Sequence, residues 1–292
     1  MKNPKADLPI GIFDSGIGGI SVLAAIIKIL PNEEFIYFAD TLHAPYGNKP
    51  ENVVRELSIK AAEFLSSIGI KCLVVACNTA TGAAINEIRK MCAFPVVGME
   101  PAVKPAVELG LSGKILVMAT PLTLKSKKFN ELIRHYKRRS EIGPLPCPGL
   151  VEIIEQGHIH GREIEEYLSR LFSSVNKEDI SVIVLGCTHF VLIKEKIIKI
   201  GGREINVTDG NYGTARQLRR TLQNDRLLNN VIMEKHKIPL KTNIRFYISG
   251  NGKEVIRRCK QLLQKEGIVC ESEFSHVEEF SFYLSGLYDV WH

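Results

Sequence analysis

The stretch Leu73–Thr79, with the sequence LVVACNT, is the part of this 292-residue chain that says most about its fold. Its apolar residues run without interruption into a cysteine, an amide and a hydroxyl. A continuous apolar run of this length is typical of a strand buried on both faces, as in a parallel sheet. The polar residues would then lie at the carboxyl end of the strand, where open α/β sheets bind their ligands.

A second stretch, Ile183–His189, repeats this pattern with the sequence IVLGCTH. Cys77 and Cys187 therefore occupy the same place, each directly after an apolar strand and before polar side chains. The repeat suggests two similar lobes, each of which presents one cysteine.

Further apolar runs extend the same pattern along the chain, with amphipathic stretches between them. This alternation predicts an α/β fold of mainly parallel sheets flanked by helices, with right-handed crossovers. We expect strands at Pro9–Phe13, Phe35–Ala39, Leu73–Ala76, Val96–Met99, Ile115–Ala119, Ile180–Leu185, Ile205–Thr208 and Ile244–Ser249, and helices at Val53–Ile68, His160–Ser174 and Thr214–Asn224. The polar residues that follow strands are Asp14–Ser15, Asp40–Thr41, Cys77–Thr79, Thr120, Cys187–His189 and Asp209–Gly210.

Charge and cysteine content narrow the function classes. The net charge of +6 is a mild surplus, and we interpret the basic runs Lys125–Lys128 and His135–Arg139 as solvated helix faces, so no nucleic-acid partner is expected. The polar start Met1–Pro9 predicts no secretory signal, and no apolar run is long enough to predict a membrane span. Seven cysteines at irregular spacing do not resemble a disulfide framework, so we expect a cytoplasmic protein with reduced thiols.

The loop Asp14–Gly19 joins the first expected strand to an apolar, helix-like run. Its glycines would let backbone N–H groups converge on an anion such as a carboxylate. The spacing differs from that of a dinucleotide-binding loop, and no Walker lysine follows, so a nucleotide site is disfavoured. A tight turn with a capping aspartate remains an alternative.

Cys77 and Cys187 differ in context from Cys72, Cys92, Cys259 and Cys270, which we interpret as buried structural residues. If helices begin just after Cys77 and Cys187, their N-termini would favour the thiolate form. The spacing disfavours a zinc site and a CxxC redox site. A Cys–His hydrolase is disfavoured because Cys187 and His189, two residues apart at a strand end, are expected to point in opposite directions. Two-base proton exchange at one carbon fits a pair of thiols from separate lobes best.

Five ordered segments resemble the glutamate racemase family. These segments are Gly11–Gly19, Asp40–Lys49, Ala76–Ala80, Ala119–Ser126 and Leu185–His189, and they span most of residues 10–210. The resemblance implies two α/β lobes with the substrate in a cleft between them. We expect residues 1–99 and 210–292 to form one lobe and residues 100–209 to form the other.

The resemblance also implies roles for individual residues. Cys77 would act on the D-enantiomer and Cys187 on the L-enantiomer, assisted by Asp14, His189 and Glu155. The implied substrate contacts are Asp14, Ser15, Tyr46, Gly47, Asn78, Thr79, Thr120, Thr123, Thr188 and His189. For the hydroxyl residues, helix capping and turn formation is an alternative role that is compatible with ligand contact.

The family's activity would interconvert L- and D-glutamate and supply D-glutamate for peptidoglycan. No metal or cofactor is expected, since no strand end carries the lysine that pyridoxal phosphate would need. The family often forms homodimers, which we expect here. An aspartate racemase of the same superfamily is the nearest alternative, and a non-catalytic binding protein is a more distant one.

Four positions depart from the family's pattern. His43 stands where arginine is common, Phe190–Val191 replaces a Tyr-Pro pair, and Glu152 replaces a proline. The aromatic tail Phe280–His292 is expected to form a helix packed on its lobe, with a dimer contact or a regulatory element as the alternative.

Overall fold

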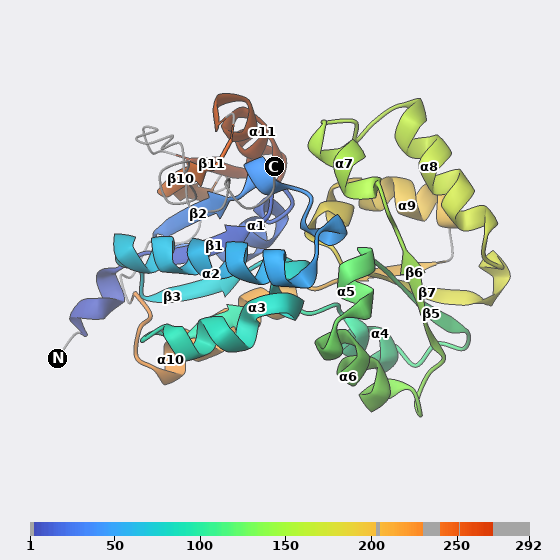
Figure 1. Ribbon diagram of the computed structural model, residues 1–292, viewed down its shortest axis with the longest axis horizontal. Helices are drawn as coiled ribbons and strands as arrows, with labels where there is room; N and C mark the ends of the chain where they lie inside the picture. The colour runs from blue at the N-terminus through green and yellow to red at the C-terminus, as the bar shows by residue number, and fades with distance from the viewer. Residues whose placement is uncertain (1–2, 203–204, 230–239, 251, 271–292) are drawn as a thin grey trace.

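Two parallel sheets organise the computed structural model, which describes residues 3–202, 205–229, 240–250 and 252–270 (Figure 1). The first sheet has the strand order β10-β2-β1-β3-β4, and the second has the order β6-β5-β7-β8. The first contains β1 (Ile10–Asp14), β2 (Phe35–Ala39), β3 (Cys72–Val75), β4 (Val96–Gly98) and β10 (Ile244–Ile248). The second contains β5 (Lys114–Ala119), β6 (Ile142–Pro146), β7 (Ile180–Leu185) and β8 (Asn206–Asp209), and a separate pair is formed by β9 (Leu240–Thr242) and β11 (Ile268–Cys270).

The expected α/β fold with two lobes is confirmed. Every expected strand is present, with its ends within one residue of the expected positions. The central strand β1 is buried at every position, and it pairs in parallel with β2 and β3, so that Phe13 lies beside Phe38 and Val75. The strands β6, β9 and β11 were not expected from the sequence.

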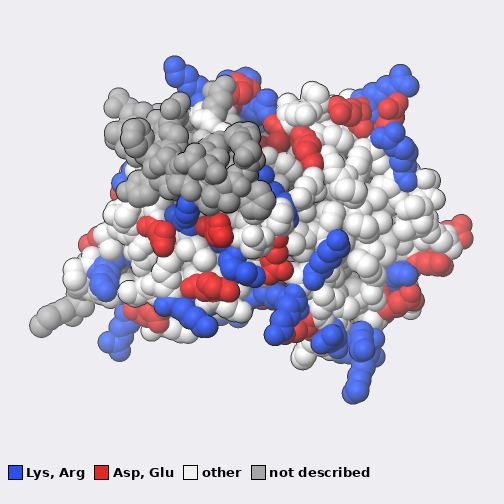
Figure 2. Space-filling view, in the orientation of Figure 1, with Lys and Arg blue, Asp and Glu red and all other residues white. Residues whose placement is uncertain are grey.

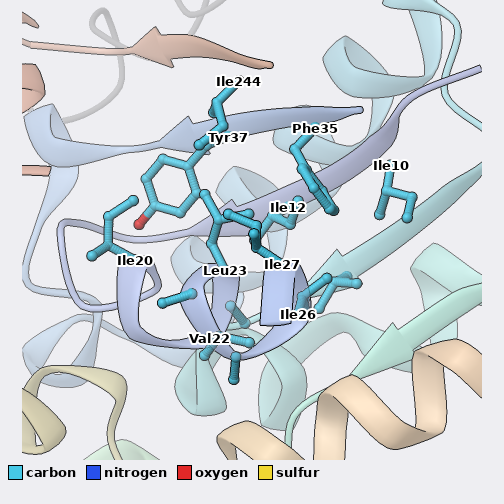
Figure 3. Packing of buried hydrophobic residues seen from close by; sticks show 14 of the residues in the cluster. Ile10, Ile12, Ile20, Val22, Leu23, Ile26, Ile27, Phe35, Tyr37 and Ile244 are labelled. Carbon is cyan, nitrogen blue, oxygen red and sulfur yellow. The ribbon is translucent and has the colours of Figure 1, made fainter. Parts of the chain in front are cut away.

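Helices cover both faces of the first sheet, which lies to the left in Figure 1. One face carries α1, α10 and α11, and the other carries α2 and α3. Helix α1 is buried nearly all round because its apolar residues contact the sheet on one side and α10 on the other, as the packing in Figure 3 illustrates. The helices are α1 (Ile20–Ile29), α2 (Glu51–Ile68), α3 (Asn78–Met91), α10 (Asn211–Asn224) and α11 (Gly252–Lys265).

The second sheet is covered in the same manner. Helices α7, α8 and α9 pack on one face, and α4 and α6 pack on the other. The helices of this lobe are α4 (Val103–Glu108), α5 (Pro121–Lys125), α6 (Lys127–Tyr136), α7 (Leu150–Glu155), α8 (Arg162–Ser173) and α9 (Lys194–Gly201). Short 3-10 helices complete the chain: η1 (Pro4–Asp7), η2 (Thr41–His43), η3 (Tyr46–Asn48), η4 (Lys177–Asp179) and η5 (Thr188–Ile193).

The surface carries charges of both signs. Figure 2 shows Lys and Arg side chains interspersed with Asp and Glu over the visible face. In the first basic run, Lys128 pairs with Glu100 at 2.8 Å and Lys127 lies 3.9 Å from Glu131. Among the described helices, none is long and apolar enough to cross a membrane. The tail Phe280–His292 lies outside the described residues.

Candidate active site

Cys77 lies at the N-terminus of α3, separated by one residue from the end of β3, and is 6% exposed. Its Sγ accepts a hydrogen bond from the Ala80 N–H at 3.4 Å and lies 3.4 Å from Ser15 Oγ. Burial raises the pKa of the Cys77 thiol to about 12, and the charge of Asp14 adds to the effect, while these two hydrogen bonds oppose it. The N–H at the start of α3 lowers the pKa of Cys77, in the expected direction, but desolvation outweighs this contribution. The thiol is protonated at neutral pH.

Cys187 follows β7 in the second lobe, and its Sγ lies 3.7 Å from His189 Nδ1. Residues two apart on a strand would point in opposite directions. Here the 3-10 helix η5 begins immediately after Cys187, and its turn brings the imidazole back toward the sulfur. The expectation that these two side chains point apart is therefore wrong.

His189 is held between Cys187 and Glu155. Its Nε2 is hydrogen-bonded to Glu155 Oε1, and its Nδ1 also lies 3.4 Å from Thr188 Oγ1. Burial by itself would lower the pKa of His189, but hydrogen bonds with Cys187 and Glu155, and the charges of both, hold the pKa well above its usual value. The imidazole is therefore a cation at neutral pH, and each ring nitrogen can donate a hydrogen bond.

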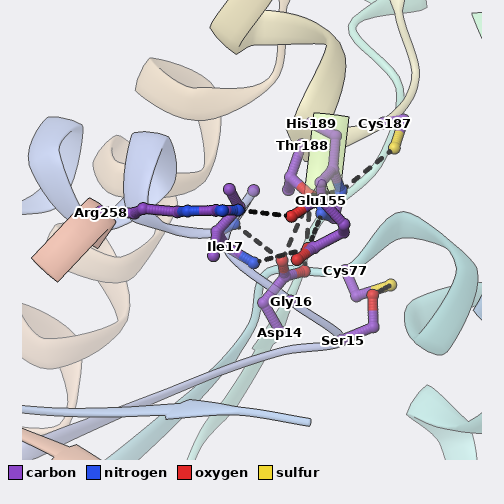
Figure 4. A network of polar contacts seen from close by, with 12 residues as sticks. Asp14, Ser15, Gly16, Ile17, Cys77, Glu155, Cys187, Thr188, His189 and Arg258 are labelled. Atoms are coloured by element: carbon purple, nitrogen blue, oxygen red, sulfur yellow. Dashed lines mark hydrogen bonds and ion pairs between the residues drawn. The ribbon is translucent and has the colours of Figure 1, made fainter. Parts of the chain in front are cut away.

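Glu155 also connects the two lobes. Its Oε1 accepts a hydrogen bond from the Ile17 N–H at 2.8 Å, although Glu155 ends α7 and Ile17 belongs to the loop after β1. Figure 4 shows these groups as one continuous polar network that reaches from Asp14 to Cys187.

Asp14 closes β1 and is completely buried. Its Oδ2 accepts from the Gly19 N–H at 2.7 Å, and the Thr188 hydroxyl lies 3.4 and 3.5 Å from its two oxygens. Burial raises the pKa of Asp14 to about 6, although the positive charge of His189 and the hydrogen bond from Gly19 lower it. The aspartate thus closes the loop turn, as the capping alternative predicts, and also contacts the opposite lobe.

Gly18 shows how closely the lobes approach. A Cβ atom at this position would lie 2.5 Å from Thr188 Oγ1 and 2.6 Å from the backbone nitrogen of His189. Real Cβ atoms do not occupy such positions, so only glycine fits here. Gly16 and Gly18 therefore allow close approach to the second lobe, whereas Gly19 lies against Asp14 and Tyr37 of the first lobe.

A second interlobe contact is made by three buried hydroxyls. Thr79 Oγ1 lies 3.0 Å from Thr120 Oγ1 and 2.9 Å from Thr123 Oγ1, and the latter two are 2.9 Å apart. Thr120 also caps α5, and a Cβ atom at Gly47 would lie 2.5 Å from its side chain. The backbone of η3 therefore lies against this hydroxyl cluster.

Asn78 is 4% exposed, yet neither Oδ1 nor Nδ2 of its side chain has a hydrogen-bond partner in the structure. Buried amides without partners are rare and costly. Because Asn78 lies next to Cys77 and Thr79, its amide is available to a polar ligand at this place.

Tyr46 is placed differently from the other expected contacts. Its hydroxyl donates to Asp40 Oδ2 at 2.6 Å, and its ring packs near Phe13. Asp40 also accepts from Ser249 Oγ at 2.6 Å and lies 2.8 Å from His43 Nδ1. The side chain of Tyr46 thus stabilises η3, and only the backbone of Tyr46 is available to contact a ligand.

The sequence of this chain matches a known protein family. The family model for Asp/Glu/Hydantoin racemases matches residues 22–218. The chain belongs to this racemase family. A glutamate racemase of Clostridium novyi is 49% identical over 258 residues, which cover 88% of this chain and 97% of the relative. One from Clostridium botulinum is 51% identical over 222 residues, covering 76% of this chain and 86% of the relative.

Solved structures agree with this membership. The glutamate racemase of Francisella tularensis in complex with D-glutamate has a TM-score of 0.76 at 28% identity, covering 94% of this racemase and 100% of that chain. The Escherichia coli glutamate racemase in complex with L-glutamate and the activator UDP-MurNAc-Ala has a TM-score of 0.75 at 28% identity, covering 90% and 97% respectively.

Some supporting residues of the racemase had no assigned role from the sequence. Tyr37 donates from its hydroxyl to the Gly16 carbonyl at 2.7 Å, and Arg258 donates to the Glu155 carbonyl at 2.6 Å. The sequence marked Asp40 as a polar residue that follows a strand, but it did not predict what Asp40 contacts. Glu152, which stands where the family commonly has a proline, accepts a hydrogen bond from Asn48 of the other lobe.

Proposed function

We propose that this racemase interconverts L- and D-glutamate without a cofactor, with Cys77 and Cys187 as its two acid/base groups. The observation that carries the proposal is the pair of thiols, one from each lobe, each separated by one residue from the end of a parallel strand and each with its own polar partners. The names of the curated relatives support glutamate as the substrate.

The proposed reaction moves one proton on each face of the α-carbon. For L-glutamate, the Cys187 thiolate removes the α-proton, and the electron pair of the broken C–H bond stays on carbon as a planar carbanion. The Cys77 thiol then donates its proton to the opposite face, which gives D-glutamate and leaves Cys77 as the thiolate. His189 lies 3.7 Å from Cys187 Sγ, so the imidazolium is placed beside the sulfur that acts as the base in this direction. The reverse direction exchanges the two roles.

The remaining expected residues would hold the substrate between the sulfurs. We assign the free amide of Asn78 and the hydroxyl cluster of Thr79, Thr120 and Thr123 to its carboxylate and amino groups, together with the backbone of Tyr46 and Gly47. The remaining contacts would come from Ser15, Asp14, Thr188 and His189.

Circular dichroism of the purified protein with single enantiomers tests this function. Without added cofactor, the optical signals of L- and D-glutamate should both decay to zero. Decay with aspartate alone would assign the aspartate racemase activity instead, and no decay with either amino acid would contradict a catalytic role. Cys77→Ser and Cys187→Ser should each abolish full turnover, and near wild-type racemisation by either variant would contradict the two-base mechanism.

The wider setting follows from the same proposal. The product D-glutamate would serve peptidoglycan synthesis in the cytoplasm, and the enzyme would act as a homodimer, which light scattering can test. We also propose lobes comprising residues 1–99 with 210–292, and residues 100–209. The membership of the strands supports this division, since β1–β4 and β10 share one sheet and β5–β8 share the other.

A further inference from the structure

Arg258 joins α11 of the first lobe to the end of α7 in the second lobe. Its Nη1 donates to the Glu155 carbonyl at 2.6 Å, and its Nη2 lies 3.4 Å from the Gln156 carbonyl. Its Nε donates to Glu254 Oε1 at 3.0 Å, which fixes the direction of the guanidinium. The last carbonyls of a helix have no intrahelical partners, so Arg258 supplies donors that α7 itself lacks.

The residue that Arg258 holds by its backbone is the residue that holds His189 by its side chain. The carboxylate of Glu155 accepts hydrogen bonds from His189 and from the Ile17 N–H, and His189 contacts the sulfur of Cys187. Figure 4 shows this chain of contacts, with Arg258 entering from one side and both sulfur atoms on the other. A shift of the Glu155 backbone would therefore move the imidazole relative to Cys187.

We propose that Arg258 is a positioning residue for the Cys187 half of the reaction. It fixes the end of α7, and thereby the Glu155–His189 pair, without contacting the reacting atoms. The inference rests on the proposed function, in which Cys187 exchanges a proton with the L-enantiomer. A displacement of about 1 Å at a catalytic group can cost on the order of 100-fold in rate, so the support of Glu155 has a kinetic consequence.

Rates alone cannot assign the effect to one of the two sulfurs. L- and D-glutamate have equal free energies in water, so kcat/KM is the same in both directions for any racemase variant. The deuterium isotope effect at Cα differs, because it reports how far proton removal limits the rate. With deuterated L-glutamate the proton is removed by Cys187, and with deuterated D-glutamate it is removed by Cys77. The two isotope effects therefore distinguish the two thiols.

The test compares Arg258→Met with wild type in both directions. We expect kcat/KM to fall about tenfold or more. The isotope effect with L-glutamate should rise, because the Cys187 step becomes more limiting, and the effect with D-glutamate should fall. Arg258 is partly exposed and lines a cavity of about 720 Å³, so its shortening removes little core packing.

Arg257→Met is the matched control. Arg257 is the preceding residue on α11 and pairs with the same Glu254 at 2.7 Å, but the hydrogen bonds to α7 come from Arg258. Its rate and both isotope effects should equal those of wild type. If Arg258→Met does not fold, Arg258→Lys replaces it, since lysine keeps the charge but not the fork geometry. This variant should shift both isotope effects in the same senses, by smaller amounts.

Unchanged isotope effects in a folded Arg258 variant would overturn the positioning role, even if the rate or the thermal stability fell. Failure of the proposed function has a different signature. In that case wild type would not racemise glutamate, or Cys187→Ser would remain active.

Discussion

Replacement of Asp14 by asparagine should make the protein more stable and less active. Asp14 is completely buried, and burial raises its pKa from 3.8 to about 6. The folded protein therefore binds this proton more tightly than the unfolded chain does. The stability that this gives is fully present below about pH 3.8 and is lost as the pH rises through about 6.

The size of the effect follows from the pKa. One pKa unit corresponds to about 1.4 kcal/mol, so ionised Asp14 reduces the free energy of unfolding by about 3 kcal/mol above pH 7. Asparagine keeps an acceptor for the Gly19 N–H but brings a second N–H that needs a partner, at a cost of about 1 kcal/mol. Asp14→Asn should thus be about 2 kcal/mol more stable than wild type at pH 8. Since wild type itself gains stability at lower pH, the difference should narrow by about 1.4 kcal/mol at pH 5.

Urea unfolding followed by circular dichroism at both pH values measures this difference, and the racemisation assay measures activity. Activity should fall about 100-fold, because asparagine cannot carry the charge beside Thr188 and His189. Asp225→Asn is the control, since Asp225 is exposed and its replacement should change neither quantity. An Asp14→Asn variant that is less stable than wild type at pH 8, or a difference that does not depend on pH, would refute the reasoning.

Three further substitutions test other parts of the structure. Glu155→Gln should lower the pKa of His189, measured by NMR titration, and reduce kcat/KM at least tenfold; an unchanged pKa would contradict the pairing. Thr79→Val should reduce the free energy of urea unfolding by about 1 kcal/mol and raise KM for glutamate, and an unchanged KM would remove this residue from the substrate contacts. Lys71→Met leaves Glu33 buried without its cation, so it should cost about 3–5 kcal/mol in urea unfolding while kcat is kept, and a small loss would contradict a buried pair.

Most of the strands that the sequence predicts are buried apolar runs, although β8 was predicted and its residues are exposed or half-buried. β3 and β7 are continuous apolar runs and were recognisable for that reason. β6 was not, because it is an edge strand whose residues alternate between buried and exposed and include two prolines. Proline is tolerated only where a strand lacks a neighbour on one side, so its presence masks the strand pattern. The strands β9 and β11 have three residues each and were missed, although β4, which is equally short, was predicted from its apolar run.

Part of the candidate site could be predicted from local sequence, and part depends on contacts between residues far apart in the chain. The two cysteines and the polar residues beside them could be recognised because each directly follows a strand of an open α/β sheet. Arg258 had no such signal, since its partner Glu155 lies 103 residues away along the chain. The contact between Cys187 and His189 was missed for a local reason, because the sequence does not say that a 3-10 turn begins at Thr188.

The surroundings of the two thiols explain how identical side chains can take opposite roles. Inversion requires one proton shared between two sulfurs, and two thiolates would repel one another while two thiols would include no base. Burial and the charge of Asp14 keep the proton on Cys77, whereas the cation His189 lies beside Cys187. Formation of D-glutamate leaves this arrangement reversed, with the thiolate at Cys77, where burial disfavours the charge. Return of a proton to Cys77 is therefore favourable, so the same desolvation that prepares the acid also drives the enzyme back to its starting protonation state.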